Sequence, residues 1–248
     1  MKIAVLGDIH ANLEALTVVL EEAKKLGVEK YICIGDIVGY NSNPHECIEI
    51  VRSLDLLGVV QGNHDSYIST QNDLTGFNPQ AAAAVIWTRK QLSKEELTWL
   101  SKLPLKKNIN IRGASTKISL VHSTLDNPHM WGYIFDKYTA EASMQYQIMQ
   151  LCFFGHTHVP LAFDKTFSGI EGGFYKEFEI KPNHKYLVNV GSVGQPRDQD
   201  PRAAFVTFDT KTKKITMHRL EYDIPACQAK IRTAGLPERL ATRLAIGQ

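Results

Sequence analysis

Short apolar runs alternate with amphipathic stretches in the N-terminal part of the chain. Ile3–Leu6, Tyr31–Ile34 and Val59–Val60 are apolar, and a glycine follows each of them within two residues. Between these runs, apolar residues recur at helical spacing after Asn12 and after Pro44, two residue types that favour a helix N-terminus. Strand-like runs separated by helices form βαβ units. We therefore predict a sheet that is at least partly parallel, with right-handed crossovers.

The pattern changes in the middle of the chain. Residues 78–103 are rich in alanine and predict two helices, with Ser93 as a cap. Apolar residues from Ile109 to Val121, around Gly113, predict an antiparallel hairpin. Residues 136–149 again show helical spacing. Buried or alternating strands are expected at 151–154, 160–164, 175–180, 185–190, 203–208 and 214–219.

The C-terminal segment, residues 224–247, predicts one or two short helices broken at Gly235-Leu236-Pro237. No internal repeat or low-complexity linker divides the chain. Its 248 residues, 44% of them hydrophobic, are enough for one sizeable core. We therefore predict a single domain over residues 1–248, of the α/β (α+β) class, in which two mixed sheets pack face to face with helices outside.

Composition and charge limit the kinds of partner and the cellular location that we expect for the protein. The net charge is +2 and no long run has one sign, so the sequence indicates no dedicated nucleic-acid surface. Cys33 and Cys152 lie in apolar runs, and Cys47 and Cys227 are far from both, which favours buried thiols and a reducing, cytoplasmic location. No run approaches the roughly 20 apolar residues that cross a bilayer, so no membrane contact is expected. Nothing indicates an oligomeric state.

Five short motifs carry residues that bind metals. They are Asp8-Ile9-His10, Gly35-Asp36-Ile37-Val38-Gly39, Gly62-Asn63-His64-Asp65, Val121-His122 and Gly155-His156-Thr157-His158. The candidate ligands are Asp8, His10, Asp36, Asn63, His122, His156 and His158. They offer oxygen and nitrogen without thiolate, which suits Mn, Fe or Zn better than a structural zinc site built on cysteines.

Most of these motifs follow a predicted strand, and ligands bind beyond the carboxyl ends of strands in open α/β sheets. Taken singly, GDxxG is an ordinary turn and His122 an ordinary buried histidine; the five motifs together argue against chance. Asp36 lies between two glycines, and its two oxygens make it the candidate bridge between ions. Two ions about 3.5–4 Å apart form the usual clamp for displacement at phosphorus, so the chain is interpreted as a binuclear metallophosphoesterase.

The order DxH, GDxxG, GNHD, H, GHTH resembles that of the calcineurin-like metallophosphoesterase superfamily, over residues 1 to about 200. The segments Gly35–Pro44 and Asn189–Asp198 are similar to the small prokaryotic branch. The resemblance implies the αββα metallophosphoesterase fold and a divided ligand set. It implies that one ion is held by Asp8, His10 and His158 and a second by Asn63, His122 and His156, with Asp36 bridging.

The resemblance also implies roles around the metals. A hydroxide on the metals would attack phosphorus, and His64 would orient the phosphate and protonate the leaving oxygen while Asp65 holds its ring. Arg197 either belongs to a tight turn or binds the phosphate as a planar donor. The alternating aromatics Trp131, Tyr133 and Phe135 either line the substrate or belong to the core.

The motifs define a reaction class and leave the substrate open. We expect two divalent metal ions, Mn before Fe, Zn, Ni, Co or Mg, and hydrolysis of small-molecule or nucleotide phosphodiesters. The alternatives are a dinucleoside-tetraphosphatase-like hydrolase and a phosphomonoesterase or protein phosphatase. Gln61 stands where the protein phosphatases usually have arginine. A non-catalytic scaffold of the same fold, like the retromer subunit, is a remote alternative because this chain keeps its histidines.

Overall fold

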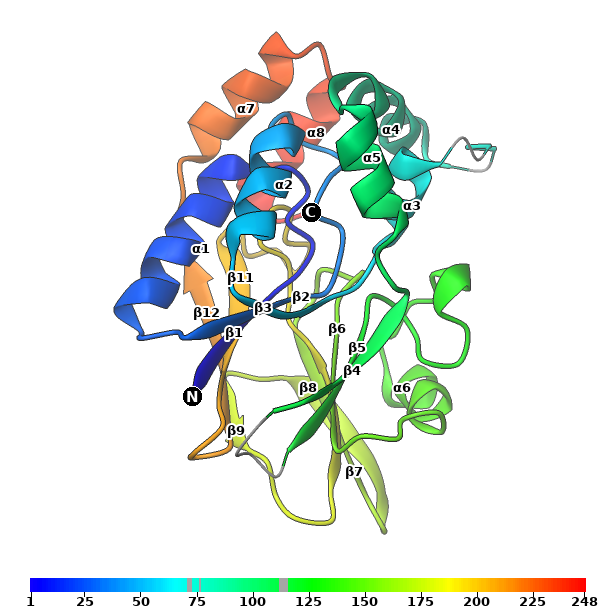
Figure 1. The fold of residues 1–248 in the computed structure, drawn as a ribbon, viewed down its shortest axis with the longest axis vertical. Helices are drawn as coiled ribbons and strands as arrows, with labels where there is room; N and C mark the ends of the chain where they lie inside the picture. Colours follow the sequence, from blue (N-terminus) through cyan, green and yellow to red (C-terminus); the bar gives the residue numbers. More distant parts are fainter. Residues whose placement is uncertain (71–72, 76, 112–115) are drawn as a thin grey trace.

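Two six-stranded sheets form the centre of the protein in the computed structural model, which describes residues 1–70, 73–75, 77–111 and 116–248 (Figure 1). Within these ranges, the first sheet has the order β3 (Leu56–Val59), β2 (Lys30–Cys33), β1 (Lys2–Leu6), β11 (Ala203–Asp209), β12 (Lys214–Leu220) and β9 (Glu177–Glu179). The second has the order β4 (Lys106–Asn110), β5 (Lys117–Val121), β6 (Leu151–Phe154), β10 (Lys185–Asn189), β7 (Leu161–Thr166) and β8 (Gly169–Phe174).

Alternation along the strands explains why the sheets stack. In β1, Ile3 and Val5 point into a core shared with Phe153 and Val188 of the second sheet. Successive side chains of a strand point to opposite faces, so Ala4 and Leu6 lie on the other face, in the core under the helices. Both faces are therefore apolar, and the expected αββα architecture is confirmed.

Helices cover the outer face of each sheet (Figure 1). Beside the first sheet lie α1 (Leu13–Lys25), α2 (Pro44–Ser53), α3 (Asn63–Ser69), α4 (Pro79–Gln91) and α5 (Lys94–Ser101). The short η1 (Pro128–Met130) and α6 (Lys137–Met144) accompany the second sheet. At the C-terminus, α7 (Ile224–Thr233), α8 (Glu238–Thr242) and η2 (Arg243–Ile246) follow one another. Their apolar residues pack against Tyr40 and the α4 residues Ala81 and Ala84.

Most predicted elements are present. Asn12 caps α1 by accepting a hydrogen bond from the Ala15 amide, and Ser93 forms a capping box with Glu96 at the start of α5. β4 and β5 pair antiparallel as expected, although the turn around Gly113 lies outside the described residues. The chain breaks between α7 and α8 at the predicted place.

Three elements differ from the sequence prediction. Helix α3, which begins at Asn63, was not expected, because a seven-residue helix shows too little periodicity. The edge strand β8 was missed because its sequence is rich in glycine and largely exposed, so it shows no regular apolar alternation. Helix α6 ends at Met144, before the predicted 149. Beyond it, the Gln147 amide donates to backbone carbonyls, including that of Tyr186, and holds the chain in a turn.

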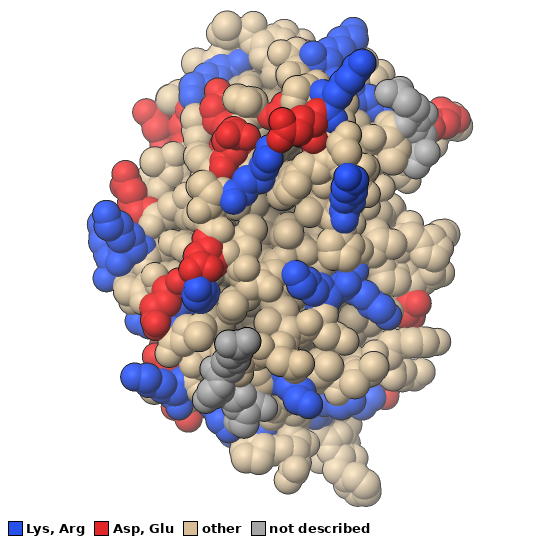
Figure 2. Space-filling model, in the orientation of Figure 1, with Lys and Arg blue, Asp and Glu red and all other residues tan. Residues whose placement is uncertain are grey.

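Other sequence expectations concern the surface and the thiols. All four cysteines are buried and form no disulfide. On the face in Figure 2, Lys and Arg side chains are interspersed with Asp and Glu. Within the described ranges, no helix combines the length and the apolar character needed to cross a membrane.

Candidate metal centre

The predicted ligands follow parallel strands in both sheets. Strands β1, β2 and β3 run parallel to one another, and so do β5, β6 and β10. Each of the five ligand motifs follows the carboxyl end of one of these strands. Parallel strands end at the same edge of a sheet, and the stacked sheets bring their two edges together.

Two groups of side chains result, and they share Asp36. The first contains Asp8, His10, Asp36 and His158, and the second contains Asp36, His122 and His156; within each group the ligand atoms lie within 4.8 Å of one another. Asn63 joins the second group, because its Oδ1 is 3.2 Å from Nε2 of His122. The structure thus brings the predicted ligands together, with Asp36 in the position expected of a bridge.

Backbone carbonyls orient the four ligand histidines. His10 Nδ1 bonds to Val38 O at 3.2 Å, His122 Nδ1 to Ile34 O at 2.8 Å, His158 Nδ1 to Gln195 O at 2.6 Å and His156 Nε2 to Trp131 O at 2.8 Å. A carbonyl only accepts, so in each ring this nitrogen carries the proton. The other nitrogen faces the cluster and can offer its lone pair to a metal once it carries no proton. Such outer hydrogen bonds are how proteins orient metal-binding histidines.

The contact between the His10 and His158 rings shows whether a cation fits between them. Their Nε2 atoms are 3.1 Å apart, and burial lowers the pKa of both rings well below the usual value. Both rings are therefore neutral, and two lone pairs face each other without a proton between them. A divalent cation bound by both nitrogens removes this conflict, so the donor set fits a metal.

The two carboxylates are fully buried side by side with the imidazoles. Burial raises the pKa of Asp8. Burial also raises the pKa of Asp36, but the charge of His122 outweighs burial and holds that pKa well below its usual range. Burial lowers the pKa of His122, yet Asp36 raises it to about 9. Without a metal, a proton on His122 is thus the cation that balances Asp36.

The backbone is strained at the ligands themselves. Asp8, His10, Asp36, His156 and His158 all have φ between 50° and 67°. This left-handed region costs energy for residues other than glycine, and such strain clusters at functional sites. In GDxxG, the positive φ values include that of the ligand Asp36 as well as those of Gly35 and Gly39.

Two glycines are needed for the close approach of the carboxylates. A Cβ atom on Gly155 would lie 2.4 Å from Oδ2 of Asp8, and one on Gly62 would lie 2.1 Å from Oδ1 of Asp36. The carboxylates therefore occupy space that any larger residue would take.

His64 lies over the first group but is not held as expected. Its ring packs against Tyr40 at 4.3 Å and His10 at 4.9 Å between centroids. Burial lowers the pKa of His64 to about 4, so the ring is neutral near pH 7 when no anion lies beside it.

The predicted contact between Asp65 and the His64 ring is wrong. The Asp65 carboxylate instead accepts hydrogen bonds from the backbone amides of Ile37, Val38 and Gly62. Nδ1 of His64 has no hydrogen-bond partner among the described residues. Asp65 therefore holds the loop that carries Asp36, since three backbone donors saturate a carboxylate better than one ring.

The segment Asn189–Asp198 forms the tight turn considered for it and contacts the ligand loops. Its turn braces the ligands, because Ser192 Oγ donates to Asp8 O and Gln195 O receives the His158 proton. Asn189 also donates to the Gly155 carbonyl. Arg197 places its guanidinium carbon 5.5 Å from the centre of the Tyr40 ring, next to His64. Sequence reasoning missed Tyr40 and the bracing role of Asn189, which no motif spacing signals.

The aromatic residues after His122 form a wall. Tyr133 stacks on His156 with centroids 4.2 Å apart, and Phe135 stacks on Tyr133 at 5.7 Å. Tyr133 and Phe135 are 51% and 55% exposed, so they do not belong to the core. Trp131 contributes the carbonyl that orients His156.

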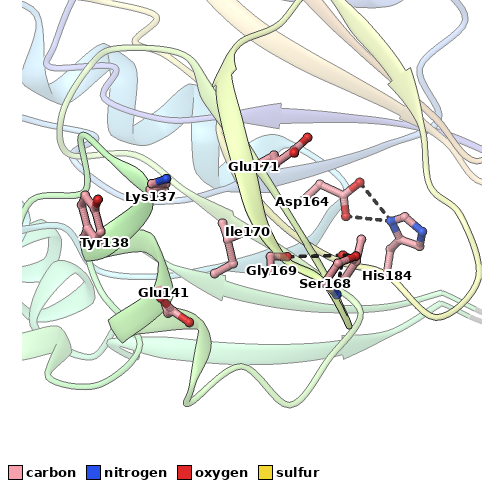
Figure 3. A pocket seen from close by; sticks show the side chains of 10 residues that line it. Lys137, Tyr138, Glu141, Asp164, Ser168, Gly169, Ile170, Glu171 and His184 are labelled. Carbon is pink, nitrogen blue, oxygen red and sulfur yellow. Dashed lines mark hydrogen bonds and ion pairs between the residues drawn. The ribbon is translucent and has the colours of Figure 1, made fainter.

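A separate cavity of 570 Å³ lies between α6 and the β7–β8 hairpin (Figure 3). His184 and Asp164 in its lining pair with each other at 2.8 Å. None of the predicted ligands lines it, so we do not assign it to the metal centre.

Comparison of the sequence with known protein families gives one match over most of the chain. Residues 1–213 match the family model described as the calcineurin-like phosphoesterase superfamily domain. The chain belongs to this superfamily. Members are metal-binding phosphoesterases, and the clustered Asp and His side chains described above are the candidates for holding divalent ions.

Three relatives match this chain over nearly all of its length. An uncharacterized protein of Methanocaldococcus jannaschii is 41% identical, over 99% of this chain and 98% of its own. A solved metallophosphoesterase of Sphaerobacter thermophilus is 39% identical with a TM-score of 0.85, covering 100% of this chain and 99% of its own. A hypothetical protein of Pyrococcus horikoshii is 25% identical with a TM-score of 0.81, covering 100% and 98%.

Asp36→Asn is expected to lower metal content more than removal of any other single ligand. The amide carries no charge and cannot serve both groups equally. Metal affinity should fall by more than the roughly 10–100-fold that loss of an outer-shell partner costs. Elemental analysis after dialysis measures this, with Asp164→Asn as the control. Full metal content in Asp36→Asn would show that Asp36 is not the bridge.

Gly155→Ala tests the space around Asp8. The added methyl group displaces the Asp8 carboxylate, so metal affinity should drop about 10–100-fold, as for other disturbed ligand shells. Gly173→Ala is the matched control, because a Cβ there meets nothing within 4 Å. Equal metal affinity of both variants, measured by competition with a chelating dye, would contradict the close approach.

Proposed function

We propose that the protein is a metal-dependent hydrolase of small-molecule or nucleotide phosphodiesters that holds two divalent ions. The observation that carries the proposal is that Asp36 belongs to two ligand groups, each completed by imidazoles, with a ring nitrogen of His10 and one of His122 facing its carboxylate. A single-ion site needs no shared carboxylate.

The two groups define the ion positions. Asp8, His10 and His158 would hold one ion with Asp36. The other would be held by Asn63, His122 and His156, again with Asp36. Oxygen and imidazole donors favour manganese, with Fe, Zn, Ni, Co or Mg as alternatives. Bound divalent ions supply Lewis-acid polarisation of the phosphoryl group and a nucleophile at neutral pH.

The chain's own residues supply orientation and a proton. Arg197, whose guanidinium lies on the Tyr40 ring beside His64, would bind a non-bridging phosphate oxygen as a charged planar donor. His64, with an Nδ1 that has no partner among the described residues, would protonate the leaving oxygen. The half-exposed rings of Tyr133 and Phe135 would stack on an aryl or base group of the ester. This aromatic wall favours a diester with an aromatic substituent over a simple monoester.

Activity is expected to require the metals. A strong chelator should abolish hydrolysis of bis(4-nitrophenyl) phosphate, and added Mn²⁺ should restore it, because the oxygen and nitrogen ligands exchange ions readily. The assay compares chelated, restored and untreated protein at equal concentration. Undiminished turnover by protein shown to be metal-free would refute the proposal.

His64→Ala is expected to separate chemistry from metal binding. Loss of a general acid slows reactions about 10²–10⁴-fold, while the metal ligands stay intact. The defect should be large for an alkyl or ribose ester and small for a nitrophenyl ester, whose leaving group departs without a proton.

The measurement is the ratio of mutant to wild-type rates for both esters at matched metal content. An equal loss for both esters would mean that His64 only positions the phosphate. A lost metal ion would instead identify His64 as a ligand.

A further inference from the structure

A second cavity, of 260 Å³, lies beside the metal centre and contains basic residues. Its lining includes Arg197 from the segment after β10, and Arg239 and Arg243 from the C-terminal helices. Arg239 and Arg243 lie beyond the part of the chain that matches the family model. We call this cavity the arginine subsite.

The arginine subsite adjoins the metal ligands through two tyrosines that also line it. The Tyr40 ring is 4.6 Å from that of His10 and 4.3 Å from that of His64. The Tyr133 ring stacks on His156 at 4.2 Å. A molecule with one group at the metal centre can therefore extend into the subsite without leaving the protein surface.

The guanidinium groups of the subsite converge without a counter-charge. The guanidinium carbons of Arg197 and Arg243 lie 5.5 and 6.0 Å from the centre of the same Tyr40 ring. Among the described residues that line the cavity, none is Asp or Glu. Nε of Arg197 is buried and has no hydrogen-bond partner within the described residues. Burial and then the Arg197 charge lower the pKa of Arg243 to about 10.

Four arginines in other described parts of the chain have acidic partners. Arg52 pairs with Glu49 and Glu95, Arg202 and Arg219 pair with aspartates, and Arg232 pairs with Glu238. Arg197 donates to the Gln195 side chain, and Arg243 donates to the backbone oxygen of Gln248. In the described part of the chain, no ion pair within 4.0 Å joins Arg197, Arg239 or Arg243 to an Asp or Glu side chain. The contrast indicates that the negative partner of the subsite comes from a ligand.

We propose that the arginine subsite binds a second phosphate group of the substrate, so that the substrate is a phosphoester carrying another phosphate. Planar guanidinium groups bind phosphate oxygens in pairs, and several together suit a group with more than one negative charge. The proposal rests on the proposed function, because it assumes that the ester phosphate occupies the metal centre. It also assigns a task to the C-terminal helices, which carry Arg239 and Arg243.

A matched pair of substrates tests the subsite. Thymidine 5′-(4-nitrophenyl phosphate) and its 3′-phosphorylated form differ by one phosphate and release the same chromophore. We expect wild-type protein to show the higher kcat/KM for the phosphorylated form. Arg239→Gln and Arg243→Gln should each reduce this preference roughly tenfold or more, mainly through KM, since a hydrogen bond to a charged group is worth about 1.5–3 kcal/mol.

Arg52→Gln is the matched control, an arginine on α2 with acidic partners and outside the subsite. It should keep the wild-type preference. Arg239 is exposed, so its substitution is not expected to disturb the fold, and circular dichroism verifies this for each variant. A wild-type protein without preference, or a preference unchanged in both subsite variants, would overturn the proposal.

Binding separates failure of the subsite from failure of the proposed function. If neither ester is hydrolysed with any divalent ion, the proposed function fails. Calorimetry in Mn²⁺ then compares thymidine 3′,5′-bisphosphate with thymidine 5′-monophosphate. Tighter binding of the bisphosphate that is lost in Arg239→Gln and Arg243→Gln supports the subsite. Equal affinity of the wild-type protein for both nucleotides overturns it.

Discussion

The burial of Asp8 and Asp36 within one cluster is the constraint on which the rest of the structure depends. Two carboxylates removed from water repel each other and lose hydration, which is affordable only beside cations. In the metal-free chain, a proton on His122 offsets Asp36, while burial suppresses the charge of Asp8. The cluster is therefore arranged to bind positive charge, and among its side chains only His122 supplies any.

The stacked sheets hold this unfavourable arrangement in place. Apolar side chains such as Ile3 and Phe153 join the sheets behind the site, and the parallel strands end together in front of it. The backbone beyond those ends turns sharply, which leaves Asp8, Asp36 and His158 in left-handed conformations. Strain of this kind persists only where the surrounding packing determines the conformation. Core packing thus stabilises a site that would not form in isolation.

The sequence predicted which Asp and His side chains cluster and how the elements follow one another along the chain, because both depend on local patterns. Asp8 and His10 follow a buried run, and two sheets with helices outside follow from the alternation of elements. The groups that orient the ligands escaped prediction. His158 is oriented by the Gln195 carbonyl and His10 by that of Val38, and every residue has a carbonyl. Asp65 was assigned to His64 because they are adjacent, yet its carboxylate faces backbone amides.

Long-range contacts also explain why the arginine subsite has no sequence signature. Tyr40 follows the second ligand motif, whereas Arg243 belongs to the final helical turn, and only folding brings them together. The ligand loops are confined by strain, carbonyl contacts and crowded glycines, so they tolerate little change. The C-terminal helices contribute Arg239, Leu240 and Arg243 to the lining of the arginine subsite. Arg239 and Arg243 belong to neither ligand group, so substitutions at these two positions leave the set of candidate metal ligands unchanged.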